Sequence, residues 1–95
     1  MTILDQIATR IIKEQELVIG PLAWDEAGKV SGMHVIDSKK GEVNLNTRDG
    51  KGVVDRLVAR YEQLFGEASH EVCREAVADL VAEMPIAEIP ASLQA

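Results

Sequence analysis

Aromatic residues are scarce in this sequence, which contains one Trp, one Tyr and one Phe among 95 residues. Pockets for small molecules are lined mostly by apolar and aromatic side chains, with a few precisely placed polar groups. The scarcity of aromatic residues therefore argues against a binding site with strong small-molecule specificity.

Cysteine is equally scarce, because Cys73 is the only one. A single cysteine excludes an intramolecular disulfide and a zinc site built from several thiolates, and it fits a reducing compartment. Cys73 falls on an apolar stripe with Ala76 and Val77. We therefore expect it to be buried as a small hydrophobic residue, rather than paired with His70 as a nucleophile.

Long apolar runs are missing. The longest nearly apolar run covers residues 17–24 and is interrupted by Gly20-Pro21, so it is too short to cross a bilayer. Charged residues, among them Asp5, Arg10 and Lys13, interrupt the N-terminal stretch, which lacks the continuous apolar segment of a signal peptide. We expect a cytoplasmic protein that does not enter the membrane.

Basic residues are nearly absent from the C-terminal third. Residues 1–61 hold nine acidic and nine basic residues, whereas residues 62–95 hold seven acidic residues and one basic residue, Arg74. The net charge of −6 therefore arises entirely in the C-terminal third. Since phosphate contacts need Lys and Arg, an acidic chain is a poor ligand for nucleic acid.

Apolar spacing of three to four residues predicts helices over 3–19 and 21–30, and the first has an apolar stripe that includes Ile7, Ile11 and Val18. Gly20-Pro21 either separates these helices or kinks a single one. Residues 33–37 and 42–47 read as strands joined by a four-residue loop, 38–41.

A third helix enters at Asp49-Gly50 and ends at Gly66, and a fourth is capped by Ser69 and ends before Pro85. The predicted class is α+β and mostly helical, in the order α-α-β-β-α-α. A small antiparallel hairpin packs on the helices, and the last two helices form an αα-hairpin. We expect one compact domain over 1–84, followed by a tail, 85–95.

An acidic stripe is the most informative feature of the fourth helix. Its members are spaced four apart and therefore share one face of a continuous helix; they are Glu71, Glu75, Asp79 and Glu83. Like charges at this spacing cost about 1 kcal/mol in total. The stripe is either a solvated face, with some charges paired to Arg56 and Arg60, or a docking face for a basic partner.

Apolar candidates for partner binding are Trp24, the only tryptophan, and three side chains of the tail, Ile86, Ile89 and Leu93. Trp is enriched at the centres of protein interfaces, although a single Trp also suits a core. The tail either folds back over the core or forms a hydrophobic arm that inserts into a partner groove.

Chemistry-bearing clusters are absent from the sequence pattern. Glu67-x-x-His70 matches half of a di-iron site in helical bundles, but no second copy exists. We therefore expect no metal, no cofactor and no catalytic residues. The predicted function is a non-catalytic protein-interaction domain, regulatory or adaptor in role, that self-associates as a homodimer.

Two other functions stay open. One is a regulatory module that binds a small molecule in an apolar pocket between the helices and the hairpin. The other is a small enzyme that uses His34 or His70 as an acid–base group.

Overall fold

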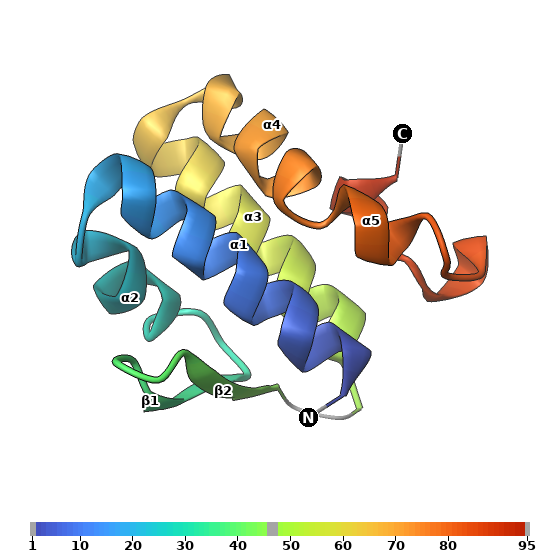
Figure 1. The fold of residues 1–95 in the computed structure, drawn as a ribbon, viewed down its shortest axis with the longest axis horizontal. Helices are drawn as coiled ribbons and strands as arrows, with labels where there is room; N and C mark the ends of the chain where they lie inside the picture. Colours follow the sequence, from blue (N-terminus) through green and yellow to red (C-terminus); the bar gives the residue numbers. More distant parts are fainter. Residues whose placement is uncertain (1, 46–47, 95) are drawn as a thin grey trace.

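The structure is a computed structural model that describes residues 2–45 and 48–94. Its elements, in chain order, are α1 (Ile3–Ile19), α2 (Leu22–Ala27), β1 (Met33–Asp37), β2 (Glu42–Leu45), α3 (Gly50–Phe65), α4 (Glu67–Ala76), α5 (Ala78–Val81) and two short 3-10 turns, η1 (Ile86–Glu88) and η2 (Ala91–Leu93) (Figure 1). The predicted α+β class and the predicted order of elements are confirmed.

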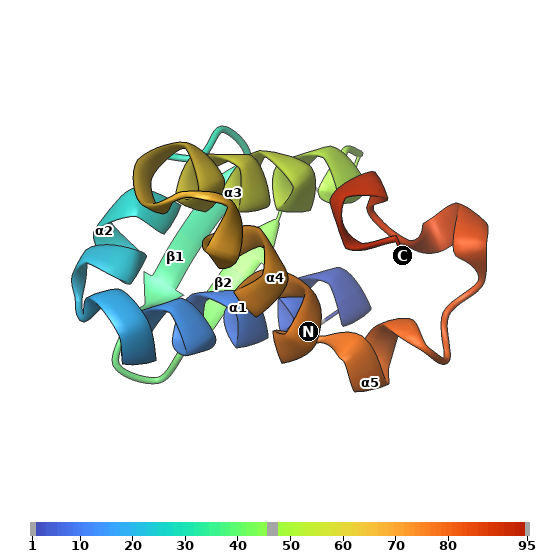
Figure 2. The ribbon, with the colours of Figure 1, turned by 90° about the horizontal axis from the view of Figure 1, so that it is seen from above.

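Helices α1 and α3 form the middle of the molecule, where they lie side by side and run in the same direction (Figures 1 and 2). The β-hairpin covers one side of this pair and α4 covers the other. The core lies between these layers because each helix turns one apolar stripe inward. The buried side chains of α1 and α3 include Ile7, Ala8, Ile11, Ile12, Val53, Val54, Leu57, Val58 and Tyr61.

A capping box starts α1. The Thr2 hydroxyl accepts a hydrogen bond from the Asp5 backbone N–H at 3.1 Å, and the Asp5 carboxylate accepts one from the Thr2 N–H at 3.0 Å. The other oxygen of Asp5 accepts the Leu45 backbone N–H at 3.0 Å. The buried carboxylate of Asp5 therefore joins the start of α1 to the end of β2.

Gly20 separates α1 from α2, which resolves the two readings of Gly20-Pro21. Its φ of 71° is a left-handed conformation that favours glycine, and its N–H donates to the Glu16 carbonyl at 2.9 Å. The next helix begins at Leu22, directly after Pro21. From α3, the buried Tyr61 hydroxyl donates to the Ala23 carbonyl at 2.7 Å and fastens α2 to the core.

The hairpin pairs β1 and β2 in antiparallel fashion, with Met33 opposite Leu45 and an irregularity near Asp37. The four-residue loop is as predicted, since β1 ends at Asp37 and β2 begins at Glu42. The Thr9 hydroxyl donates to the Gly41 carbonyl at 3.1 Å and holds the turn against α1. The predicted second strand extends two residues further, to 46–47, which lie outside the described residues.

The prediction of one continuous fourth helix is wrong. Helix α4 begins at Glu67, directly after Gly66 (φ 92°), so Ser69 lies buried inside the helix rather than capping it. Helix α4 ends at Ala76, and the next residue, Val77, has a φ of −122° and a ψ of 11° that break the helical path before α5. Like charges four residues apart oppose a continuous helix here, and the Val77 side chain at the break is buried in the core.

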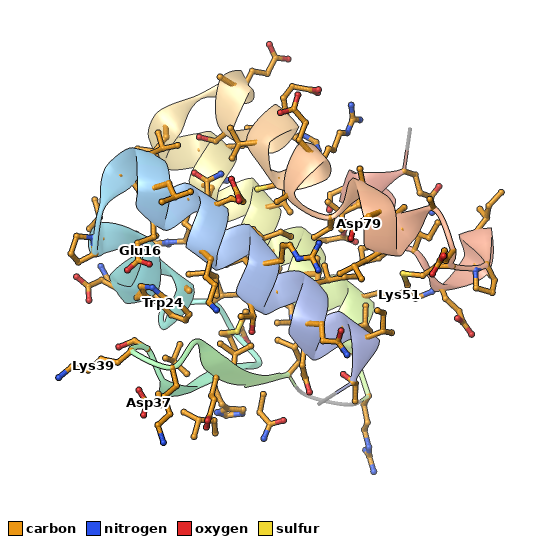
Figure 3. The ribbon with its side chains drawn as sticks, viewed as in Figure 1. Glu16, Trp24, Asp37, Lys39, Lys51 and Asp79 are labelled. Atoms are coloured by element: carbon orange, nitrogen blue, oxygen red, sulfur yellow. The ribbon has the colours of Figure 1, made fainter. Side chains whose placement is uncertain are left out.

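The tail folds back onto α3 and α4. Ile89 and Leu93 are buried in the core cluster, whereas Ile86 is 75% exposed. The Asp55 carboxylate accepts hydrogen bonds from the Ser92 N–H (2.9 Å) and the Ser92 hydroxyl (2.5 Å). Lys51, at the start of α3 (Figure 3), donates to the Ala87 carbonyl at 2.7 Å. These contacts favour the core-covering reading of the tail over a free hydrophobic arm.

Candidate functional site

A groove between α1 and the α4–α5 segment is the strongest candidate for a binding site. Its volume is about 430 Å³. It is lined by Arg10, Glu14, Leu17 and Val18 from α1, by Val72, Glu75 and Ala76 from α4, and by Asp79 from α5. We call it the α1–α4 groove.

Two exposed aliphatic side chains stand at this groove. Leu17 is 81% exposed and Val18 is 68% exposed, and they are adjacent near the end of α1. Val18 was predicted to belong to the buried stripe of this helix, and that prediction is wrong. The helix instead turns Gln15 into the core, where its amide donates to the Ser69 carbonyl at 3.0 Å and to the Cys73 sulfur at 3.4 Å.

The charged residues of the α1–α4 groove are mostly acidic, since three carboxylates face one guanidinium. Arg10 pairs with Asp79, which is labelled in Figure 3, and the two contacts are 2.7 and 2.9 Å long. The Arg10 guanidinium lowers the pKa of the Asp79 carboxyl, chiefly by this hydrogen bonding. Glu14 and Glu75 are both exposed at the groove, so its surroundings remain negative after the Arg10–Asp79 pair forms.

The predicted acidic stripe is divided by the break at Val77. Glu75 and Asp79 line the α1–α4 groove. Glu71 pairs with Arg74 at 3.0 Å and lines a different depression with Glu67 and His70. Glu83 lies exposed beyond α5. The prediction that these four residues share one helical face is therefore wrong. Two of them, Glu75 and Asp79, still line the same groove.

The pairing expected for the stripe also differs. Arg56 contacts Asp49 at 3.1 Å, and Arg60 contacts Glu26 at 2.7 Å, rather than any member of the stripe. Arg10, from α1, reaches Asp79 of the stripe across the fold. The sequence offered no signal for this contact, because it joins residues 69 positions apart.

The apolar candidates differ in accessibility. Trp24 is 7% exposed, Ile89 is 8% exposed and Leu93 is 5% exposed, so all three lie in the core of this chain. The Trp24 indole N–H is buried and has no hydrogen-bond partner within the described part of the chain. Ile86 is the one of these four candidates that a partner can contact without unfolding the domain.

Cys73 is buried, as the sequence predicted. Burial raises the pKa of its thiol to about 11, although the Gln15 hydrogen bond acts in the opposite direction. His70 is engaged elsewhere: its Nδ1 lies 3.0 Å from the Glu62 carboxylate and its Nε2 lies 2.6 Å from the Ser92 carbonyl. These bonds give the histidine a structural role between α3, α4 and the tail.

The other chemistry-bearing residues do not converge. His34 lies exposed on β1, whereas His70 belongs to α4. These two elements lie on opposite sides of the α1–α3 pair (Figure 1). Residues 2–45 and 48–94 contain no group of three His, Cys, Asp or Glu side chains that could hold a metal ion. No helix in these ranges is long and apolar enough to cross a membrane.

Comparisons of the chain with protein-family models, with curated proteins and with solved structures find no match to any of them.

Proposed function

We propose that this domain acts by binding another protein, and that the α1–α4 groove receives an amphipathic helix with basic flanks. The observation that supports this function is the exposure of Leu17 and Val18 at a groove with acidic surroundings. An apolar centre with a charged rim is the usual anatomy of a site that binds one face of a helix.

The apolar part of the groove supplies affinity. Leu17 and Val18 stand beside Val72 and Ala76, which are partly buried. Fully burying an aliphatic side chain contributes about 1.5–3 kcal/mol. Two such side chains contribute about 3–6 kcal/mol, before the loss of translational and rotational freedom is subtracted. A reversible complex of modest affinity follows from this balance.

The charged part of the groove selects the partner. Glu14 and Glu75 would lie beside Lys or Arg side chains of a bound helix, and complementary charge speeds association and rejects acidic partners. A second copy docked through the same groove would bring identical carboxylates together, because a two-fold interface places the same patch on both sides. The groove thus favours a basic partner over a second copy.

The self-association expected from the sequence stays a separate prediction. Light scattering coupled to size-exclusion chromatography tests it directly. A clean monomer at high micromolar concentration would contradict a homodimer and leave the proposed groove interaction unaffected.

Fluorescence anisotropy with a labelled synthetic helix of leucine and lysine, about five turns long, tests the proposed function. The peptide is expected to bind, and its leucine–glutamate counterpart is not. Leu17→Ser should weaken binding by at least about tenfold, since about 1.5 kcal/mol or more of burial is lost. Ile36→Ser is the matched control, because Ile36 is 60% exposed on β1, away from the groove.

A charge-matched pair of variants separates docking from general attraction. Glu75→Lys changes a residue of the groove, and Glu83→Lys makes the same charge change outside its lining. Glu75→Lys is expected to weaken the peptide complex more strongly than Glu83→Lys. Equal effects of the two reversals, together with an unaffected Leu17→Ser complex, would refute the proposed function.

A further inference from the structure

A second cleft, independent of the α1–α4 groove, is unusual in its charge. It has a volume of about 260 Å³ and is formed by the connection between α2 and β1 together with one face of α3. Its lining residues are Lys29, Val30, Ser31, Arg56, Ala59, Arg60 and Gln63. All ionisable residues in this lining are cations, although the chain has a net charge of −6.

Glu26 restrains two of these cations, Lys29 and Arg60, through its carboxylate. Its carboxylate is buried and accepts hydrogen bonds from Arg60 Nε at 2.8 Å and from Lys29 Nζ at 3.1 Å. Arg60 Nη2 also lies 2.7 Å from the same carboxylate. These hydrogen bonds from Arg60 and Lys29 lower the pKa of Glu26. The carboxylate is therefore a fixed negative anchor beneath the two cations.

The two anchored cations keep donors for a ligand. A guanidinium has five N–H donors and an ammonium has three. Glu26 engages Arg60 through Nε and Nη2, and engages Lys29 through one contact. The remaining N–H groups belong to side chains that line the cleft. Because their positions are already restricted by Glu26, binding an anion costs them less conformational entropy.

Arg56 is also held at the cleft. Its Nε and Nη2 donate to the Ser31 carbonyl at 3.3 and 3.0 Å, and its Nη1 donates to the Asp49 carboxylate at 3.1 Å. Three cations and the two carboxylates that contact them leave a net positive charge at the cleft. This charge is the reverse of the charge of the whole chain.

We propose that this cleft binds the phosphate group of a small phosphomonoester. Planar guanidinium groups match the geometry of phosphate oxygens, and an ammonium adds a compact positive charge. The volume is below that of a pocket for a drug-sized ligand, so the cleft holds the phosphate group while the remainder of the ligand lies outside. The Gln63 side chain, also in the lining, offers an uncharged donor.

Nuclear magnetic resonance titration of the ¹⁵N-labelled protein tests this site, with inorganic phosphate and glycerol phosphate as probes and chloride at matched ionic strength as reference. Both phosphates are expected to cause saturable shifts in the backbone signals of residues 29–31 and 56–63. Shifts that fail to saturate, or that chloride reproduces, would overturn the proposal. Binding of inorganic phosphate with exclusion of glycerol phosphate would also overturn it.

Substitutions that remove one positive charge provide a second test of the phosphate site. Lys29→Gln is expected to weaken phosphate binding by about tenfold, and Lys29 is exposed enough for this change to leave the fold intact. Lys40→Gln makes the same charge change in the hairpin loop and is expected to leave affinity unchanged. Equal affinities of wild type and Lys29→Gln, with the fold verified by circular dichroism, would contradict the site.

Discussion

The C-terminal tail offers a sharp test of the fold, because it contains two isoleucines in opposite environments. Ile89 is 8% exposed and belongs to the core cluster, whereas Ile86 is 75% exposed, three residues earlier. The same substitution to alanine at these two positions therefore compares a buried and an exposed side chain within one segment.

The expected loss of stability follows from the buried atoms. Ile→Ala removes three carbon atoms, which at about 0.8 kcal/mol each gives about 2.4 kcal/mol of transfer free energy. Incomplete collapse of the cavity brings the usual range for such substitutions to about 2–5 kcal/mol. We expect Ile89→Ala to lie in this range and Ile86→Ala to change the free energy of unfolding by less than about 0.5 kcal/mol.

Urea denaturation measures both variants. Trp24 is the only tryptophan and is buried, so its fluorescence reports unfolding of the whole domain. With a slope of about 1–3 kcal/mol per molar urea, a loss of about 2–5 kcal/mol in Ile89→Ala should lower the midpoint by about 0.7–5 M. Equal midpoints for the two variants would refute the placement of the tail in the core.

Three further outcomes follow from buried or paired groups. Tyr61→Phe should cost about 1–3 kcal/mol of unfolding free energy, because the Ala23 carbonyl loses its 2.7 Å hydrogen bond; a neutral effect in urea denaturation would contradict that bond. Cys73, with its pKa raised to about 11, should react slowly with iodoacetamide in the native protein and rapidly in urea; fast native alkylation would contradict its burial. Because the pKa of Glu26 is lowered from 4.5 in the folded state, its contribution to stability is present above pH 4.5 and is lost as pH falls through the lowered value. Glu26→Gln should flatten the stability profile in that acidic range, and parallel profiles would contradict the prediction.

Local sequence patterns were sufficient for most of the fold. The capped helix from Ile3 to Ile19, the four-residue hairpin loop and the end of α3 at Gly66 all depend on residues close in sequence. Apolar spacing, turn residues and glycine at a helix end report such local structure directly. The order of elements followed from these signals.

The wrong predictions concern features that depend on contacts between residues distant in sequence. The acidic spacing of the last helix implied one continuous face, but the helix breaks at Val77, which is buried, and Asp79 pairs with Arg10. Gln15 occupies a core position through hydrogen bonds to α4, while Val18 is exposed. Valine is usually buried and glutamine is usually exposed. Residue type and spacing therefore predict the reverse of the arrangement found at these two positions.

The candidate sites also combine features that local sequence patterns predict with features that depend on contacts distant in sequence. Sequence spacing identified Glu75 and Asp79 as candidates, but it could not bring them beside Leu17 and Val18. The cationic cleft joins residues of the α2–β1 connection to residues of α3, with no shared local pattern. Both arrangements depend on how the elements pack.

The location of a bound basic helix tests the central proposal most directly. The measurement is a ¹H–¹⁵N correlation spectrum of the labelled domain during titration with the leucine–lysine peptide. Binding in the α1–α4 groove predicts that the largest shifts map to residues 10–18 and 72–79, which include the lining of the groove. Shifts confined to the hairpin, or an absence of saturable shifts at the groove, would contradict the proposed function.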